Sequence, residues 1–170
     1  MPKGLKRFQQ TKQLHFITFS CYKRQPFLSS KTAKDIVQQI LEETRQQQNL
    51  RIAAYVLMPE HVHLLTNEPK TGTLAVFLQI LKQRTSRELK SPDQKQFWQR
   101  RYYDFNVSTN EKHIEKLQYI HRNPVIRGLV ERPEDYRWSS FNHYAIGEIG
   151  PVEIESEWTA RRREHSKSSL

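Results

Sequence analysis

The stretch RIAAYVLMPEHVHLLT, residues 51–66, contains the pattern that decides the fold. Arg51 to Met58 and His61 to Thr66 each have the length and residue types of a β-strand. Met58-Pro59-Glu60 separates them, and proline favours a turn there because it has no N–H to donate to a strand ladder. The stretch therefore predicts two strands that follow one another and pair.

Further strands and helices are predicted on both sides of this hairpin. Apolar residues three or four positions apart behind a capping residue predict a helix, and alternating ones predict a strand. In chain order we expect a strand from Gln13 to Tyr22, a helix from Ser30 to about Gln48, the two hairpin strands, a helix after Thr71-Gly72-Thr73, a strand from Phe97 to Val107, and a helix that opens at Asn110 and that Pro124 closes. The order β-α-β-β-α-β-α predicts the α+β class, with a ferredoxin-like antiparallel sheet and helices packed mainly on one face.

Length and composition exclude several classes of protein. A chain of 170 residues is most simply one domain, large enough for a core without disulfides or metals. No run approaches the roughly 18 apolar residues of a membrane span, and the basic N-terminus lacks the apolar core of a signal peptide. The single cysteine, Cys21, cannot form an internal disulfide, which favours a reducing compartment. We therefore expect a cytoplasmic protein, neither secreted nor membrane-spanning.

The net charge of +10 is unevenly distributed along the chain. Residues 1–34 carry eight basic side chains and no acidic one, and residues 82–101 carry seven basic side chains against two acidic ones. Such clusters predict a polyanionic partner, because each neutralised phosphate releases condensed counterions. A charged surface that serves only solubility is the alternative, and an anionic membrane surface is a lesser one.

His61-Val62-His63 is the sharpest local motif. Residues i and i+2 of a strand project from the same face, so both imidazoles point one way while Val62 and Leu64 point into the core. Two adjacent imidazoles can chelate one metal ion. The same His-x-His pattern also occurs without a metal, as two polar residues on the solvent-exposed face of an antiparallel sheet. A metal site needs a third ligand from elsewhere.

The last predicted helix supplies candidates for that ligand and for a nucleophile. Its expected buried stripe is Ile114, Leu117 and Ile120, and at about 100° per residue Tyr119 lies nearly opposite. Glu115 and Asn123 lie one turn before and after Tyr119, on its face of the helix. Asn123 precedes a proline, where the α conformation is disfavoured. His121 points roughly the other way and is interpreted as a residue at the edge of the core.

Four stretches, in this order, resemble the REP-associated tyrosine transposases, a group within the single-tyrosine branch of the HUH superfamily. They are FITFSCYKRQPFL (16–28), YVLMPEHVHLL (55–65), FWQRRYYDFNV (97–107) and LQYIHRNPVIRGLVERPEDYRWSS (117–140). The resemblance covers about residues 7 to 144, and YIHRNPV followed by PEDYRWSS is its most specific part. It implies that residues 1–145 form an HUH catalytic domain, while the charge pattern of residues 146–170 predicts an acidic segment followed by a flexible basic C-terminal tail.

The resemblance also implies the roles of individual residues. His61 and His63 would bind a divalent metal, Tyr119 would be the nucleophile, and Asn123 would be the third ligand, where many relatives have glutamine. The implied ion is Mg²⁺ or Mn²⁺, whereas two imidazoles by their ligand chemistry lean toward Mn²⁺ or Zn²⁺. Attack by Tyr119 would leave a 5′-phosphotyrosine and a free 3′ hydroxyl. The base that activates the phenol stays open between metal-bound water, Glu115 and Lys116.

The implied partner is single-stranded DNA with imperfect hairpins and a short adjacent tetranucleotide. Such a substrate needs cations for phosphates and aromatic faces for unstacked bases, with no role for a membrane or a small-molecule substrate. The N-terminal Lys3, Lys6, Arg7 and Lys12 would extend the contact area. The predicted DNA-binding side chains are Lys82, Arg84, Arg87, Arg100, Arg101, Arg161, Arg162 and Arg163.

Two other functions fit the same residues. A catalytically silent relative would hold DNA or RNA hairpins without cutting them, and a metal-dependent ribonuclease would cleave RNA without a covalent intermediate. The presence of both histidines together with Tyr119 favours the transposase function. For the oligomeric state we expect a monomer in preference to a dimer.

Overall fold

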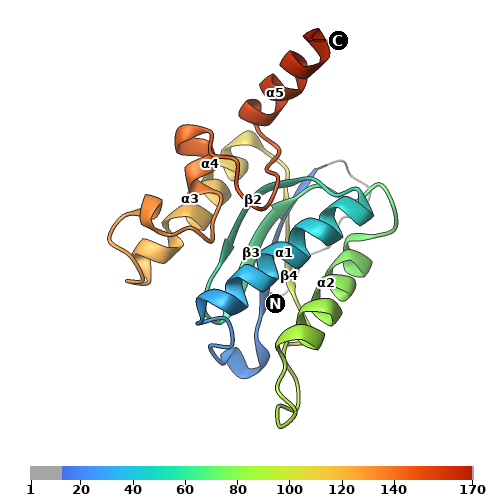
Figure 1. The fold of residues 1–170 in the computed structure, drawn as a ribbon, viewed down its shortest axis with the longest axis vertical. Coiled ribbons are helices and arrows are strands. Elements are labelled where there is room, and N and C mark those ends of the chain that lie inside the picture. Colours follow the sequence, from blue (N-terminus) through green and yellow to red (C-terminus); the bar gives the residue numbers. More distant parts are fainter. Residues whose placement is uncertain (1–12, 170) are drawn as a thin grey trace.

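The computed structural model describes residues 13–169, whose centre is a four-stranded antiparallel sheet with the order β2-β3-β1-β4 (Figure 1). The strands are β1 (Leu14–Ser20), β2 (Ile52–Leu57), β3 (His61–Thr66) and β4 (Tyr103–Val107). The predicted hairpin is confirmed, since β2 and β3 pair antiparallel across the turn at Met58-Pro59-Glu60. β1 lies between β3 and β4 and pairs with both.

Three long helices cover the sheet, and the predicted element order and α+β class are confirmed. Helices α1 (Lys31–Gln48) and α2 (Leu74–Leu89) lie side by side over one face (Figure 1). Helix α3 (Asn110–Ile126) contacts β2, β3 and β4, and it lies over the opposite face. The shorter elements are η1 (Tyr22–Arg24), η2 (Pro133–Asp135), α4 (Phe141–Ile146) and α5 (Glu157–Ser168).

Local sequence explains where the long helices begin. Ser30, Thr73 and Thr109 each accept a hydrogen bond from the backbone N–H three residues on, which satisfies one of the unpaired donors of the first turn. The predicted caps at Ser30 and Thr73 are therefore confirmed. α1 ends at Asn49, whose left-handed φ of 54° is a conformation that asparagine tolerates.

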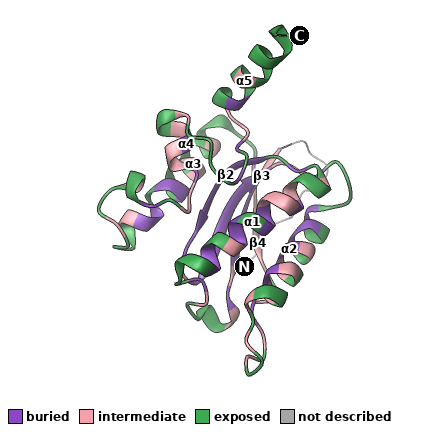
Figure 2. Cartoon of the chain, in the orientation of Figure 1, coloured by how far each residue is buried: buried purple, intermediate pink, exposed green. Residues whose placement is uncertain are grey.

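The strands of the sheet are mostly buried (Figure 2). Alternation along them divides the buried side chains into two cores. Ile17, Val62 and Leu64 belong to the larger core under α1 and α2. Phe16 and Leu65, which point the other way, belong to the smaller core under α3. The prediction that Val62 and Leu64 are core residues is thus confirmed, and their neighbours in β3 face α3.

Two predicted boundaries are wrong. The strand expected from Phe97 begins at Tyr103, because Phe97 and Trp98 are buried in the larger core and only Trp98 forms an isolated bridge, to Cys21. Pro124 does not close α3, which continues to Ile126. A proline in the last turn removes a single backbone donor, and its own carbonyl accepts from Leu129, so the helix tolerates it there.

The C-terminal segment differs from the expected flexible tail, since residues 157–168 form α5, capped by Ser156. Arg163 pairs with Glu153 and Glu155, so the acidic segment provides the counter-charges of the basic one. Ile154 packs into the larger core and bridges to Ile52. The division of the chain after residue 145 stays a prediction. Within residues 13–169 no helix has both the length and the apolar character to span a membrane.

Candidate active site

His61 and His63 lie side by side on the α3 face of the sheet. Their Nε2 atoms are 2.9 Å apart, and both residues are buried, each with 4% of its surface exposed. The strand pairing places Ser20 opposite His61 and Thr18 opposite His63 on the neighbouring strand β1. The two imidazoles therefore converge on a single point, as the strand geometry predicts.

Each histidine is oriented by a polar side chain on its other ring nitrogen. Glu60 Oε1 lies 3.0 Å from Nδ1 of His61, and the Thr18 hydroxyl lies 2.7 Å from Nδ1 of His63. Burial lowers the pKa of His61, and it lowers that of His63 well below its ordinary value. Both rings are thus neutral near pH 7, and Glu60, which only accepts, assigns the Nδ1 proton to His61 and leaves its Nε2 lone pair available.

Glu60 also connects the histidines to two arginines. Its Oε1 accepts from Arg127 at 2.5 Å and lies 3.6 Å from Arg24. Burial acts to raise the pKa of Glu60. The hydrogen bond from Arg127 and the electrostatic interactions of Glu60 with His61 and Arg127 outweigh burial, so the pKa of Glu60 is lowered. Glu60 is therefore ionised at neutral pH. One carboxylate links β3 to the end of α3 and to the turn after β1.

Tyr119 faces the histidines from α3. Its ring centroid lies 5.3 Å from that of His63 and 5.9 Å from that of Phe16, both edge to face, and the residue is 48% exposed. The predicted burial stripe is wrong at its first member, because Ile114 is 48% exposed whereas Ile120 is fully buried. α3 is rotated so that Tyr119 lies over the sheet, with one side open to solvent.

Asn123 lies one turn beyond Tyr119 and is buried. Its Nδ2 has no hydrogen-bond partner among the described residues. A 180° rotation of the side-chain amide would put Oδ1 where Nδ2 now lies. An amide oxygen is a suitable ligand for a hard cation. The expected conflict with Pro124 does not arise, since Asn123 is helical.

The remaining candidates on α3 lie outside this group. His121 is buried against Phe141 and bonds to Ser140, and burial lowers its pKa to about 4. It is a core residue, as predicted. Glu115 pairs with Lys112 at 3.0 Å on the exposed side of the helix. The ammonium of Lys116 lies over the rings of Phe16 and Phe105.

The residues present fit a divalent metal ion. Neutral imidazoles with converging Nε2 atoms, each held at Nδ1 by an oxygen, are the usual arrangement of metal-binding histidines. Thr18 suits either tautomer of His63, because a hydroxyl can donate to Nδ1 or accept from it. Among residues 13–169 no cluster of three His, Cys, Asp or Glu side chains could hold a metal, so a third protein ligand would have to be of another type, such as an amide.

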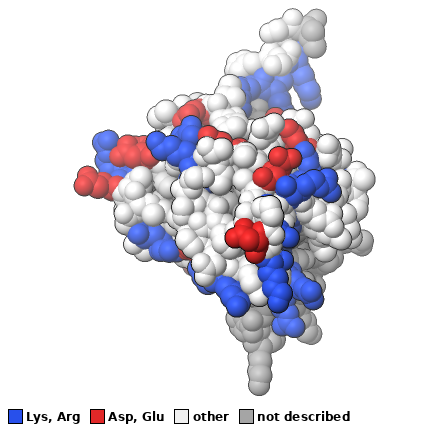
Figure 3. Space-filling view, turned by 60° about the horizontal axis from the view of Figure 1, so that its bottom comes forward, with Lys and Arg blue, Asp and Glu red and all other residues white. Residues whose placement is uncertain are grey.

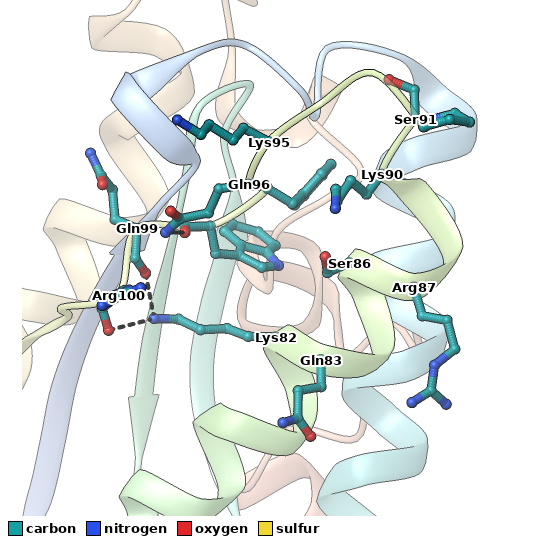
Figure 4. A pocket seen from close by; sticks show the side chains of 13 residues that line it. Lys82, Gln83, Ser86, Arg87, Lys90, Ser91, Lys95, Gln96, Gln99 and Arg100 are labelled. Atoms are coloured by element: carbon teal, nitrogen blue, oxygen red, sulfur yellow. Dashed lines mark hydrogen bonds between the residues drawn. The ribbon is translucent and has the colours of Figure 1, made fainter.

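The predicted DNA-binding residues do not form one surface. Lys82 donates to the backbone carbonyls of Gln99 and Arg100 (Figure 4), and burial lowers its pKa to about 8. It thus supports the segment before β4. Arg84 pairs with Glu43 on α1. Both cations have protein partners, which makes them poor candidates for phosphate contacts.

Arg87 and Arg100 line an open hollow of about 760 Å³ between α2 and the segment that follows it (Figure 4). In Figure 3, Lys and Arg side chains gather toward the lower edge of the visible face. The arginines at 161–163 lie on α5, which projects from the end of the molecule opposite the loop after α2 (Figure 1). The N-terminal Lys3, Lys6, Arg7 and Lys12 lie outside the described residues.

Sequence reasoning missed four residues that support the site. Thr18 and Arg24 precede the motif by some forty residues, and Arg127 follows it by more than sixty, so no local spacing connects them to His61. One signal was available for Glu60, which directly precedes the histidine pair.

The sequence profile described as "Transposase IS200 like" matches residues 9–123. This match contains both histidines, Tyr119 and Asn123. The chain belongs to the IS200-like transposase family. The resemblance found in the sequence is thereby confirmed.

Two curated relatives and one solved structure belong to the same group. A Haemophilus influenzae protein assigned to the REP-associated tyrosine transposases is 31% identical over 111 residues, which cover 58% of this chain and 62% of that protein, less than two thirds of its length. The REP-associated tyrosine transposase of Escherichia coli K12 is 23% identical, over 72% of this chain and 73% of its own. A structure of a REP-associated tyrosine transposase bound to a REP hairpin has a TM-score of 0.71 and 19% identity, over 89% of this chain and 90% of that one, which confirms the fold.

Proposed function

We propose that the protein is a metal-dependent enzyme that nicks and rejoins single-stranded DNA bearing REP-like hairpins, through a covalent 5′-phosphotyrosine intermediate. The observation that carries this proposal is the position of Tyr119, whose ring lies 5.3 Å from His63 beside two converging Nε2 atoms. A partly exposed phenol next to a cation site is what a phosphodiester needs for attack by a tyrosine. Because all of these side chains come from one chain, we propose that it acts as a monomer.

His61, His63 and Asn123 would hold the divalent ion, Mg²⁺ or Mn²⁺. Bound there, the ion would neutralise charge on the phosphate oxygens, which otherwise repel a nucleophile. Glu60 and Thr18 keep both imidazoles turned toward that position. Glu60 also carries a negative charge that balances the approaching cations.

Tyr119 would form the new bond. Its Oη attacks phosphorus, the bond from phosphorus to O3′ breaks, and O3′ leaves with a proton as a free hydroxyl. The phenol has an open side through which its own proton can reach solvent. The hydrogen bond to Glu60 raises the pKa of Arg127, so this side chain carries its positive charge at neutral pH. Reversal with another 3′ hydroxyl would rejoin the strand without ATP.

The DNA partner is supported by the family and by charge. The structural relative is bound to a REP hairpin, and the open hollow between α2 and the following segment is lined by basic side chains, including Arg87 and Lys90. We propose a single strand with an imperfect hairpin as the substrate. A catalytically silent hairpin-binding protein is the outcome that the experiment must distinguish.

The test is to incubate the protein with a labelled hairpin-bearing single strand and Mn²⁺, and to resolve protein–DNA adducts that survive SDS. We expect an adduct with wild type, none with Tyr119→Phe, and at least a 100-fold slower appearance with His63→Ala. Tyr144→Phe, on α4 and without a ring contact to His61 or His63 among the described residues, is the matched control and should form the adduct normally. Hairpin binding without any adduct would replace the nicking enzyme with a binding protein.

A further inference from the structure

Arg127 lies at the end of α3, on the face of the helix that also carries Tyr119 and Asn123. The three residues follow one another at intervals of four positions, which places their side chains along one side of a helix. Arg127 keeps the helical conformation, with a φ of −80°, and its backbone N–H donates to the carbonyl of Asn123 at 2.9 Å. The face with the proposed nucleophile and the proposed third ligand therefore ends in a guanidinium.

The backbone around Arg127 is fixed by the way the helix ends. The N–H of Gly128 donates to the carbonyl of Val125 at 3.0 Å, and that of Leu129 donates to the carbonyl of Pro124 at 2.9 Å. Gly128 has a φ of 73°, which favours glycine, so the chain leaves the helix axis directly after Arg127. The guanidinium thus extends from a defined point at the last turn.

One oxygen of Glu60 lies between Arg127 and His61. Oε1 of Glu60 is 2.5 Å from Nη1 of Arg127 and 3.0 Å from Nδ1 of His61. The carboxylate therefore holds the guanidinium beside the imidazole whose other nitrogen, Nε2, faces the proposed metal position. Among residues 13–169 Glu60 is the one hydrogen-bond partner of this guanidinium, which has five N–H donors and is 44% exposed. Most of these donors can accept a ligand from solvent.

The positive charge at this end of the site exceeds what Glu60 neutralises. Arg24 lies 3.6 Å from the same oxygen of Glu60, so two guanidiniums face one carboxylate. A second arginine adds little to stability, because ion pairs with an exposed partner contribute little to the free energy of folding. The surplus charge fits an anion that binds next to the histidines.

We propose that Arg127 contacts the phosphate that Tyr119 attacks, through a non-bridging oxygen that the metal ion does not bind. As Oη bonds to phosphorus and the bond to O3′ breaks, negative charge grows on the non-bridging oxygens, and a fixed guanidinium stabilises that charge. Arg127 only donates hydrogen bonds and transfers no proton, because arginine stays charged. The inference rests on the proposed function and adds a residue that touches the reacting phosphate.

The first experiment measures the rate of adduct formation at saturating DNA and Mn²⁺. Arg127→Gln should slow the adduct about 100-fold, the usual loss when one donor to a transition state is removed, and Arg127→Lys should lose less. Arg122→Gln, which removes the same charge from an exposed position on the same helix, is the matched control and should stay within about twofold of wild type. A wild-type rate with Arg127→Gln would overturn the proposal.

The affinity for Mn²⁺, measured on the same variants without DNA, separates a contact with phosphate from a structural role. Arg127→Gln should leave this affinity within about threefold of wild type. A fall in Mn²⁺ affinity that matches the fall in rate would also overturn the proposal, because Arg127 would then act only by holding Glu60 against His61.

A binding experiment keeps this inference separate from the nicking activity. The Tyr119→Phe protein, in EDTA, is titrated with a hairpin-bearing strand in which one neutral methylphosphonate replaces each single-stranded linkage in turn. At one linkage we expect neutralisation to weaken binding about fivefold or more, and Arg127→Gln, added to Tyr119→Phe, should reduce that effect to less than about twofold. If no linkage depends on Arg127, the proposal is overturned even where wild type forms the adduct. If one linkage does and wild type forms no adduct, the contact with phosphate stands and the proposed function alone fails.

Discussion

The two faces of β3 show how one strand serves two purposes. On the face under α1 and α2, Val62 and Leu64 are completely buried among apolar side chains. On the face under α3, His61 and His63 contact Glu60, Thr18 and Tyr119. The first face stabilises the sheet by removing apolar surface from water, whereas the second places polar groups at a partly open site. Substitutions at Val62 or Leu64 should therefore change the stability of the fold, and substitutions at His61 or His63 should change the chemistry of the site.

The largest expected effect is on the apolar face. Leu64→Ala should lower the free energy of unfolding by about 2–5 kcal/mol, because a fully buried side chain leaves a cavity. Urea denaturation followed by circular dichroism measures it, and Leu64→Met, which keeps the volume, should cost less than about 1.5 kcal/mol. His63→Ala should destabilise less than Leu64→Ala while abolishing Mn²⁺ binding. Equal destabilisation by the two alanine variants would contradict the separation of the two faces.

The next effect tests an ionic cluster on the sheet, formed by His15 and two carboxylates. His15 lies between Asp104 at 2.8 Å and Glu68 at 3.0 Å. Burial acts to lower the pKa of His15, but the two carboxylates prevail and raise it above its ordinary value of 6.5. A raised folded pKa contributes stability that is fully present below pH 6.5 and is lost as the pH rises through the folded value.

Asp104→Asn should therefore cost more stability at pH 6 than at pH 9, by about 1.5–3 kcal/mol at the lower pH, the range for a hydrogen bond to a charged group. Urea midpoints of wild type and variant at the two pH values give the difference. Asp93→Asn, on the exposed loop after α2, is the control and should show no such pH dependence. A loss that is greater at pH 9 would reverse the assigned sign.

A smaller effect is expected at the polar face. Thr18→Val keeps the shape of the side chain but removes the hydroxyl that orients His63, so Mn²⁺ affinity should fall about tenfold. Titration followed by electron paramagnetic resonance measures the free ion. Thr18→Ser, which keeps the hydroxyl, should restore most of the affinity. Unchanged binding by Thr18→Val would remove Thr18 from the support of the site.

The smallest effect tests how α3 is rotated. Ile114 was expected in the buried stripe, yet it is 48% exposed, so Ile114→Ala should change the free energy of unfolding by less than about 0.5 kcal/mol. Ile120→Ala, on the same helix but completely buried, should cost about 2–5 kcal/mol. Thermal or urea unfolding of the two variants distinguishes them. A large loss with Ile114→Ala would indicate that α3 lies with another face on the sheet.

Short-range patterns were sufficient for much of the fold and for half of the site. The caps at Ser30 and Thr73 and the strand from His61 to Thr66 depend on neighbours a few residues away, and all three were predicted. The shared face of His61 and His63 follows from the period of a strand. The prediction failed at Phe97, where burial of two aromatic rings in the core replaced strand pairing.

The sequence by itself determined which side chains could carry the chemistry, because a strand of period two and a helix of known pitch constrain neighbours without reference to the rest of the chain. Only the tertiary structure decided that Tyr119 faces His63, since the rotation of α3 depends on what the sheet presents to it. It also decided that Thr18 and Arg127 reach the two histidines, directly or through Glu60. The physical reason is that these contacts join residues far apart in the chain, and their distances are set by packing of the whole fold and by no local preference.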